Sequence, residues 1–117
     1  MLVLSLQDDD TALSPKDSLL QWVQLHTAGY QHVDIKSFTK SFNDGMALCA
    51  LLHKFRPSLL DYQSLDPSAG LKNLQIAMNA AEKYFGLEQY LKPDDVCQLD
   101  EKSMLVYVSE YYTGYEF

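Results

Sequence analysis

The stretch from Ser41 to Pro57, SFNDGMALCALLHKFRP, constrains the fold of this 117-residue chain most strongly. It holds seven consecutive apolar residues, Met46 to Leu52, between a polar start and a basic end. Seven residues are too few to span a bilayer, which takes about 20. A helix that is apolar on every side must be surrounded by other elements. The stretch therefore predicts the buried central helix of a small all-helical domain.

The two ends of this central helix carry signals of their own. Ser41 is expected to cap its start, with Asp44 three residues later reaching back in a capping box. Lys54 and Arg56 fall in the last turn, where positive charge suits the helix dipole. Gly45 lowers helix propensity, so its presence indicates close packing of another backbone at that point.

Apolar residues at helical spacing predict three further helices. The first starts at Ser14, a capping residue followed by a proline, and Trp22 is expected to anchor the core. The next covers about 70–85, with Gly86 as a left-handed cap, and the last starts near Asp100 and ends before Gly114. The three apolar stripes consist of Leu19, Trp22, Val23 and His26; Leu71, Leu74, Met78, Ala81 and Phe85; and Met104, Tyr107, Val108 and Tyr111. Together with the central helix they make an all-α fold of four main helices.

Charge restricts the class of partner. The net charge is −7, the pI is about 4.7, and Arg56 is the one arginine in the sequence. A nucleic-acid binder normally shows a basic face, so no nucleic-acid partner is expected. A strongly acidic partner surface meets an unfavourable long-range electrostatic energy. Residues 1–13 are interpreted as an acidic leader without the pattern of a signal peptide, which favours an intracellular, cytoplasmic protein.

The sequence offers no convergent set of catalytic or metal-binding residues. It lacks a glycine-rich phosphate loop and a nucleophile elbow, and its three histidines lie in different segments. Cys49 and His53 share the spacing of a metal half-site, but no second pair completes it. Cys49 and Cys97 are interpreted as buried structural thiols. We therefore expect no enzyme activity, no metal and no cofactor.

A series of linked motifs resembles a calponin-homology domain. They are Leu19-Leu20-x-Trp22-Val23-Gln24, Thr27-Ala28-x-Tyr30, Val33-x-Ile35, Phe38, Ser41-Phe42-x-Asp44-Gly45, and Ala50-Leu51-Leu52-His53-x-x-Arg56-Pro57-x-Leu59-x-Asp61-Tyr62. The domain so identified covers residues 14–115 and is most similar to the second of the paired domains of α-actinin, spectrin and filamin. Phe42 departs from that group, which usually has tryptophan there, and a repacked core can absorb the change.

This resemblance implies a fold of four main helices with short extra turns, and a non-catalytic module of the cytoskeleton. The module would contribute to binding of filamentous actin (F-actin), weakly in isolation, within a larger actin-crosslinking or signalling protein. In the paired arrangement the second-type domain adds its first helix. That places the candidate actin contact on Leu20, Gln21, Gln24 and Leu25, which are otherwise ordinary surface and flanking positions.

The resemblance leaves two other kinds of partner open. In α-actinin-like relatives, the segment matching 27–43 is associated with phosphoinositides, and the candidate residues for such a site are Lys36, Lys40, Lys54 and Arg56. Each basic residue near an anionic membrane contributes about 1 kcal/mol, so four suffice only for weak binding. Related single domains also regulate or localise signalling proteins through small GTPases or a neighbouring Rho-type exchange-factor domain.

Overall fold

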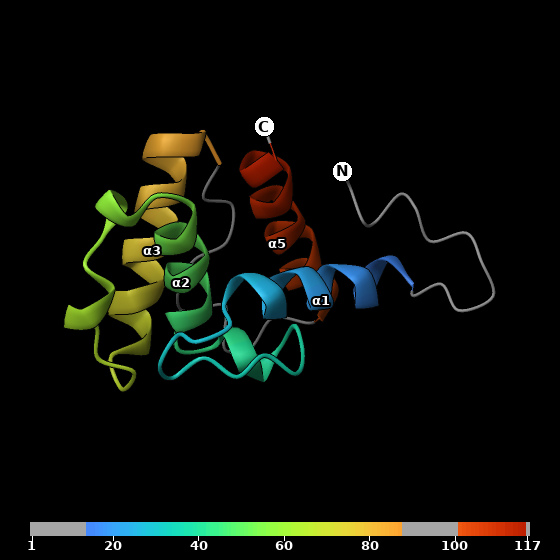
Figure 1. The fold of residues 1–117 in the computed structure, drawn as a ribbon, viewed down its shortest axis with the longest axis horizontal. Coiled ribbons are helices and arrows are strands. Elements are labelled where there is room, and N and C mark those ends of the chain that lie inside the picture. Colours follow the sequence, from blue (N-terminus) through green and yellow to red (C-terminus); the bar gives the residue numbers. More distant parts are fainter. Residues whose placement is uncertain (1–13, 88–100, 117) are drawn as a thin grey trace.

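The computed structural model describes residues 14–87 and 101–116, and in these two ranges it is all-helical, as the sequence predicts. The described residues form four α-helices, and three short 3₁₀ turns lie between the first and the third of them (Figure 1). The α-helices are α1 (Pro15–His26), α2 (Met46–Phe55), α3 (Gly70–Phe85) and α5 (Glu101–Glu116). The 3₁₀ turns are η2 (Lys40–Phe42), η3 (Pro57–Leu59) and η4 (Tyr62–Ser64). None of the described helices is long and apolar enough to cross a membrane.

Helix α2 lies at the centre of the fold, which confirms its predicted role. Every residue from Met46 to Leu52 is buried. Helix α3 lies beside α2 and runs in the same direction, since Gly45 approaches Leu74 at one end and Phe55 packs edge-on against Phe85 at the other (Figure 1). The apolar run of α2 is stable in this small protein because neighbouring elements surround it.

Helix α1 also follows the prediction. The Ser14 hydroxyl accepts a hydrogen bond from the Asp17 backbone N–H at 3.1 Å, and Pro15 occupies the first helical position. Trp22 is buried, and its ring packs edge-on against Tyr112 of α5 with centroids 5.0 Å apart. The tryptophan thus joins the first and last helices of the fold.

The start of α2 differs from the prediction. Ser41 does not cap the helix, because it belongs to η2 and its hydroxyl accepts the backbone N–H groups of Lys36 and Ser37. The helix begins only at Met46, whose N–H donates to the Asp44 carboxylate at 3.0 Å. The predicted capping box is therefore wrong. In its place, the Asp44 carboxylate accepts a hydrogen bond from the N–H of Met46, two residues later.

Helix α3 has the predicted bounds but not the predicted face. Gly86 is its C-cap, with φ +73°, and donates its backbone N–H to the Glu82 carbonyl. Leu71 was expected in the core, yet 53% of its surface is exposed. Asn73 is buried in its place, because its side-chain amide donates to the carbonyls of Asp44 (3.1 Å) and Asp66 (2.7 Å).

Helix α5 extends further than the sequence indicates. It continues to Glu116, so the predicted end before Gly114 is wrong. Tyr107 and Tyr111 are buried as expected, with their hydroxyls 3.2 Å apart, and Tyr112 is buried as well. The side chain of Tyr115, the leader 1–13, and Cys97 lie outside the described residues. The domain limits of 14–115 therefore stay a prediction.

Candidate functional site: two surfaces of a helical domain

The outer face of α1 carries the residues predicted to contact actin. Leu20 is half-buried against the core, whereas Gln21, Gln24 and Leu25 are exposed, and Leu25 shows 73% of its surface to solvent. The last three border an open groove of about 430 Å³. Its described lining carries no charged side chain, and consists of Ser18, Gln21, Trp22, Gln24, Leu25 and Ala28. This face is thus suited to apolar and amide contacts.

Gln24 also has a structural task. Its side-chain amide donates to the Ile35 carbonyl at 2.8 Å and so fastens the connector after α1 to that helix. Its donor group is therefore used inside the fold, unlike the solvent-facing side chain of Leu25. The structure thus separates the four candidate residues into one half-buried leucine, one internal tie, and the two positions most open to a partner, Gln21 and Leu25.

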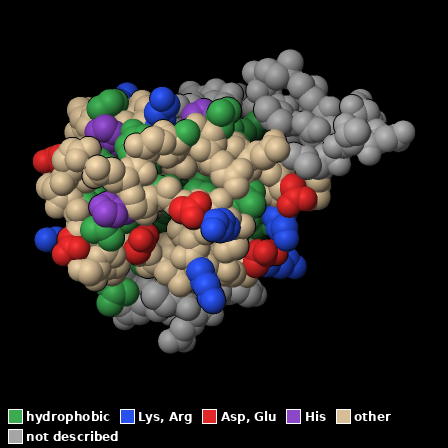
Figure 2. Space-filling model, turned by 60° about the horizontal axis from the view of Figure 1, so that its bottom comes forward, with side chains coloured by type: hydrophobic (Ala, Val, Ile, Leu, Met, Phe, Trp, Pro, Cys, Tyr) green, Lys and Arg blue, Asp and Glu red, His purple; other side chains and the backbone are tan. Residues whose placement is uncertain are grey.

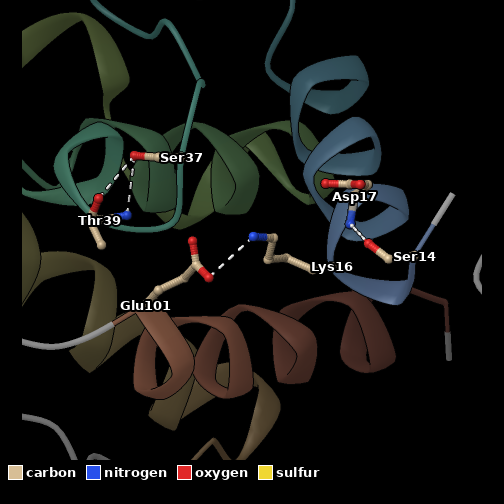
Figure 3. Close-up of polar contacts among 6 residues, drawn as sticks. All are labelled: Ser14, Lys16, Asp17, Ser37, Thr39 and Glu101. Carbon is tan, nitrogen blue, oxygen red and sulfur yellow. Dashed lines mark hydrogen bonds and ion pairs between the residues drawn. The ribbon is translucent and has the colours of Figure 1, made fainter.

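Lys16 of α1 forms an ion pair with α5. Lys16 Nζ lies 3.2 Å from Glu101 Oε1, which links the starts of α1 and α5 (Figure 3). Both side chains are about half exposed, so the pair contributes at most about 1 kcal/mol. Its main consequence is electrostatic, because the charge of Lys16 is balanced within the domain.

The four residues predicted to bind phosphoinositide do not form one cluster. Lys36 and Lys40 lie before the start of α2, and Lys36 is paired with Asp34 at 3.4 Å. Lys54 and Arg56 lie at the other end of α2, whose ten residues span about 15 Å. On the face drawn in Figure 2, acidic and basic side chains alternate instead of forming one basic patch. A phosphoinositide site built from all four residues stays a prediction without support from this arrangement.

The thiol of Cys49 is enclosed between α2 and α3. Burial, and secondly the negative charge of Asp44, raise the pKa of Cys49 to about 12. Its Sγ donates to the Asn73 carbonyl at 3.4 Å, whereas His53 Nδ1 lies 2.8 Å from the Tyr30 hydroxyl. Among the described residues, no group of three or more His, Cys, Asp or Glu side chains is placed to hold a metal ion.

Because this thiol stays protonated, we expect Cys49 to resist a thiol reagent at pH 8 in the folded domain. A Cys97→Ser variant isolates Cys49 for the measurement with Ellman's reagent. The reaction should proceed only as fast as the domain opens, and should accelerate when urea unfolds it. Modification in native buffer at the rate of free cysteine would contradict the enclosed position.

The aromatic residues around the central helix complete the framework of these surfaces. Phe42 is fully buried and stacks on Phe38 with centroids 5.7 Å apart and planes at 7°. Tyr62 is buried too, and its hydroxyl donates to the Gln31 carbonyl at 2.6 Å. Burial is the main cause that raises the pKa of Tyr62 to about 12. The helical framework with these buried positions is consistent with the calponin-homology pattern of the sequence.

Residues 13–117 match the family model of the calponin homology (CH) domain. The chain belongs to this family. Over 111 residues it is 40% identical to α-actinin-like protein 1 of Schizosaccharomyces pombe, covering 92% of the chain and 18% of that protein. It is 42% identical to the erythrocytic spectrin β chain of Mus musculus (95% and 5%) and 40% identical to MICAL-like protein 1 of Rattus norvegicus (86% and 12%). This CH domain thus corresponds to a small part of each of these relatives.

Sequence reasoning missed a second surface of the CH domain, at the other end of the bundle. An open groove of about 590 Å³ lies among the ends of α2, α3 and α5. Of its residues only Arg56 was a candidate, as part of the lipid site. The available signal was the recurrence of aromatic residues at the ends of two helices, Phe55 and the Tyr84-Phe85 pair.

Proposed function

We propose that this CH domain is a non-catalytic interaction module of the cytoskeleton that contributes to F-actin binding. The observation that carries the proposal is its identity of about 40% to α-actinin-like and spectrin β-chain proteins over more than nine-tenths of the chain. The groove bordered by Gln21 and Leu25 supports it, because its described lining carries no charged side chain and so adds no charge repulsion towards an acidic filament. The proposed place of action is the cytoplasm, on the cytoskeleton.

Binding by the domain alone should be weak. The chain has a net charge of −7, and the Lys16 charge on α1 is already balanced by Glu101. Long-range attraction to an acidic filament is therefore absent, and association depends on short-range contacts. A larger protein that supplies a second binding domain would raise the effective affinity by linkage.

Co-sedimentation of the 117-residue chain with F-actin, titrated at several salt concentrations, tests this proposal. We expect saturable binding of low affinity that persists as salt rises. Leu25→Ser should weaken it about fivefold to thirtyfold, because a leucine that becomes buried on binding contributes roughly 1–2 kcal/mol. Leu71→Ser is the matched control, since Leu71 is also exposed but lies on α3, and it should bind like the parent chain.

Three outcomes would count against the proposal in different ways. Submicromolar affinity would refute weak binding in isolation. Equal affinity of the Leu25→Ser and Leu71→Ser variants would remove α1 from the contact. A chain that does not sediment with filaments, even when joined to a second CH domain, would overturn the F-actin function itself. The role of a single CH domain in a signalling protein, with GTPase or exchange-factor partners, stays a prediction that the full-length sequence would test.

A further inference from the structure

Helices α2, α3 and α5 end at the same side of the molecule, at the top of Figure 1. The groove between these ends, here called the C-terminal groove, is lined mainly by Phe55, Arg56, Tyr84, Phe85, Leu87 and Glu110. The proposed actin contact on α1 involves none of these residues. The groove is therefore a separate surface of the domain.

The walls of the groove are aromatic and only partly buried. Phe55 and Phe85 pack edge-on with centroids 4.8 Å apart, and both remain half-buried. Tyr84 shows 47% of its surface, and Leu87 is half-buried beside it. The same two phenylalanines and Leu87 also line a second, smaller pocket, whose other walls include Trp22 and Tyr111 of the core. A concave apolar surface of this kind takes a large apolar side chain.

The positive charge of Arg56 at the rim of the groove indicates that a ligand should also carry a negative charge next to that apolar side chain. Arg56, the one arginine of the sequence, follows directly after Phe55, and in the described ranges its guanidinium has no ion-pair or hydrogen-bond partner. Guanidinium groups pair with carboxylates through two parallel hydrogen bonds. Lys83 adds a second cation over the ring of Tyr84, 5.3 Å from its centroid.

The acidic groups do not prevent such a pairing. Glu110 lies on the α5 wall of the groove, whereas Arg56 caps the end of α2, so a partner carboxylate belongs on the α2 side. The net charge of −7 acts at long range, and at physiological salt it is screened beyond about 8 Å. A short-range contact with Arg56 can thus form despite the acidic chain.

We propose that the C-terminal groove binds a segment of a partner protein in which an aromatic or large aliphatic side chain stands next to a Glu or Asp. The apolar side chain fills the space between Phe55, Tyr84 and Phe85, and the carboxylate pairs with Arg56. The apolar anchor supplies most of the binding energy, and the ion pair selects segments with an acidic neighbour and sets their direction.

A capped peptide, acetyl-Ala-Glu-Phe-Leu-Ala-amide, serves as the probe, titrated into the ¹⁵N-labelled chain by NMR. We expect saturable shifts of the backbone amides around Arg56, Tyr84 and Phe85. The same peptide with Gln in place of Glu should bind about threefold to tenfold more weakly, because it lacks the charge-assisted pair. A peptide with Ala in place of Phe should not saturate.

Two pairs of variants distinguish specific binding in the groove from general effects of charge and hydrophobicity. Arg56→Gln should weaken binding of the Glu peptide as much as replacing its Glu by Gln does. Lys54→Gln makes the same charge change at the same end of α2 and should leave binding unchanged. Tyr84→Ser should weaken it as well, unlike Leu71→Ser at the other end of α3. The proposal would be overturned by shifts centred on another surface or by the absence of saturable shifts. It would also be overturned if the Glu and Gln peptides bound equally, if Arg56→Gln and Lys54→Gln had equal effects, or if the two serine variants did.

Discussion

Replacing Gly45 by alanine is expected to lower the free energy of unfolding by about 3–5 kcal/mol, a large share of the stability of a small domain. Gly45 has φ +75°, a conformation that costs an L-residue roughly 1–2 kcal/mol. A Cβ atom there would also lie 2.6 Å from the Leu74 backbone nitrogen and 2.7 Å from Asn73 Cβ. Because a backbone atom cannot rotate away, α2 and α3 would have to separate.

Urea unfolding followed by circular dichroism measures this loss, and Gly86→Ala is its control. Gly86 has a similar φ of +73°, but an added Cβ meets no atom within 4 Å. The control therefore carries the conformational cost alone, about 1–2 kcal/mol. The difference between the two variants reports the crowding between α2 and α3. Equal losses would show that the two helices accommodate a methyl group at Gly45 without strain.

Asn73→Ala is expected to lower the free energy of unfolding by about 2–5 kcal/mol, because it leaves two carbonyl acceptors without their donor. The Asn73 amide is buried and joins the Asp44 carbonyl before α2 to the Asp66 carbonyl before α3. The loss therefore falls where both helices begin. The same unfolding measurement applies, with thermal unfolding as a second readout.

Asn79→Ala provides the matched comparison on the same helix. Asn79 is exposed, and its side-chain oxygen accepts a hydrogen bond from Gln75 at 2.8 Å. Truncation there should change stability by less than about 0.5 kcal/mol. If Asn73→Ala were no more destabilising than Asn79→Ala, the bridge would contribute nothing. A double mutant of Gly45 and Asn73 should be less destabilised than the sum of the single changes, because both act on one contact.

Much of the fold could be predicted from local features of the sequence. The bounds of α3 agree with the prediction, and α1 starts with the expected cap at Ser14. The buried run from Met46 to Leu52 identified the central helix. These features can be recognised from the sequence because each involves residues only a few positions apart: the cap, the glycine at a helix end and the apolar spacing.

The candidate surfaces could be predicted only in part. The resemblance to paired CH domains pointed to the outer face of α1, and Leu25 on that face is exposed. The basic residues appeared as one group because Lys36 and Arg56 are close in sequence, but the length of α2 separates them. The C-terminal groove draws residues from three helices, and no local pattern of the sequence connects Phe55 with Phe85 or Glu110.

Hydrophobic periodicity and short-range caps predicted an all-α fold with α2 at its centre, and the linked motifs of the sequence identified the CH family. Three features followed from tertiary packing alone: Ser41 holds a turn instead of capping α2, Asn73 is buried in place of Leu71, and the cations lie at both ends of α2. The physical reason is that each of these outcomes depends on a partner distant in sequence or on how two helices pack. The Asp44 carbonyl and the backbone of Leu74 meet their partners only after α2 and α3 have packed together.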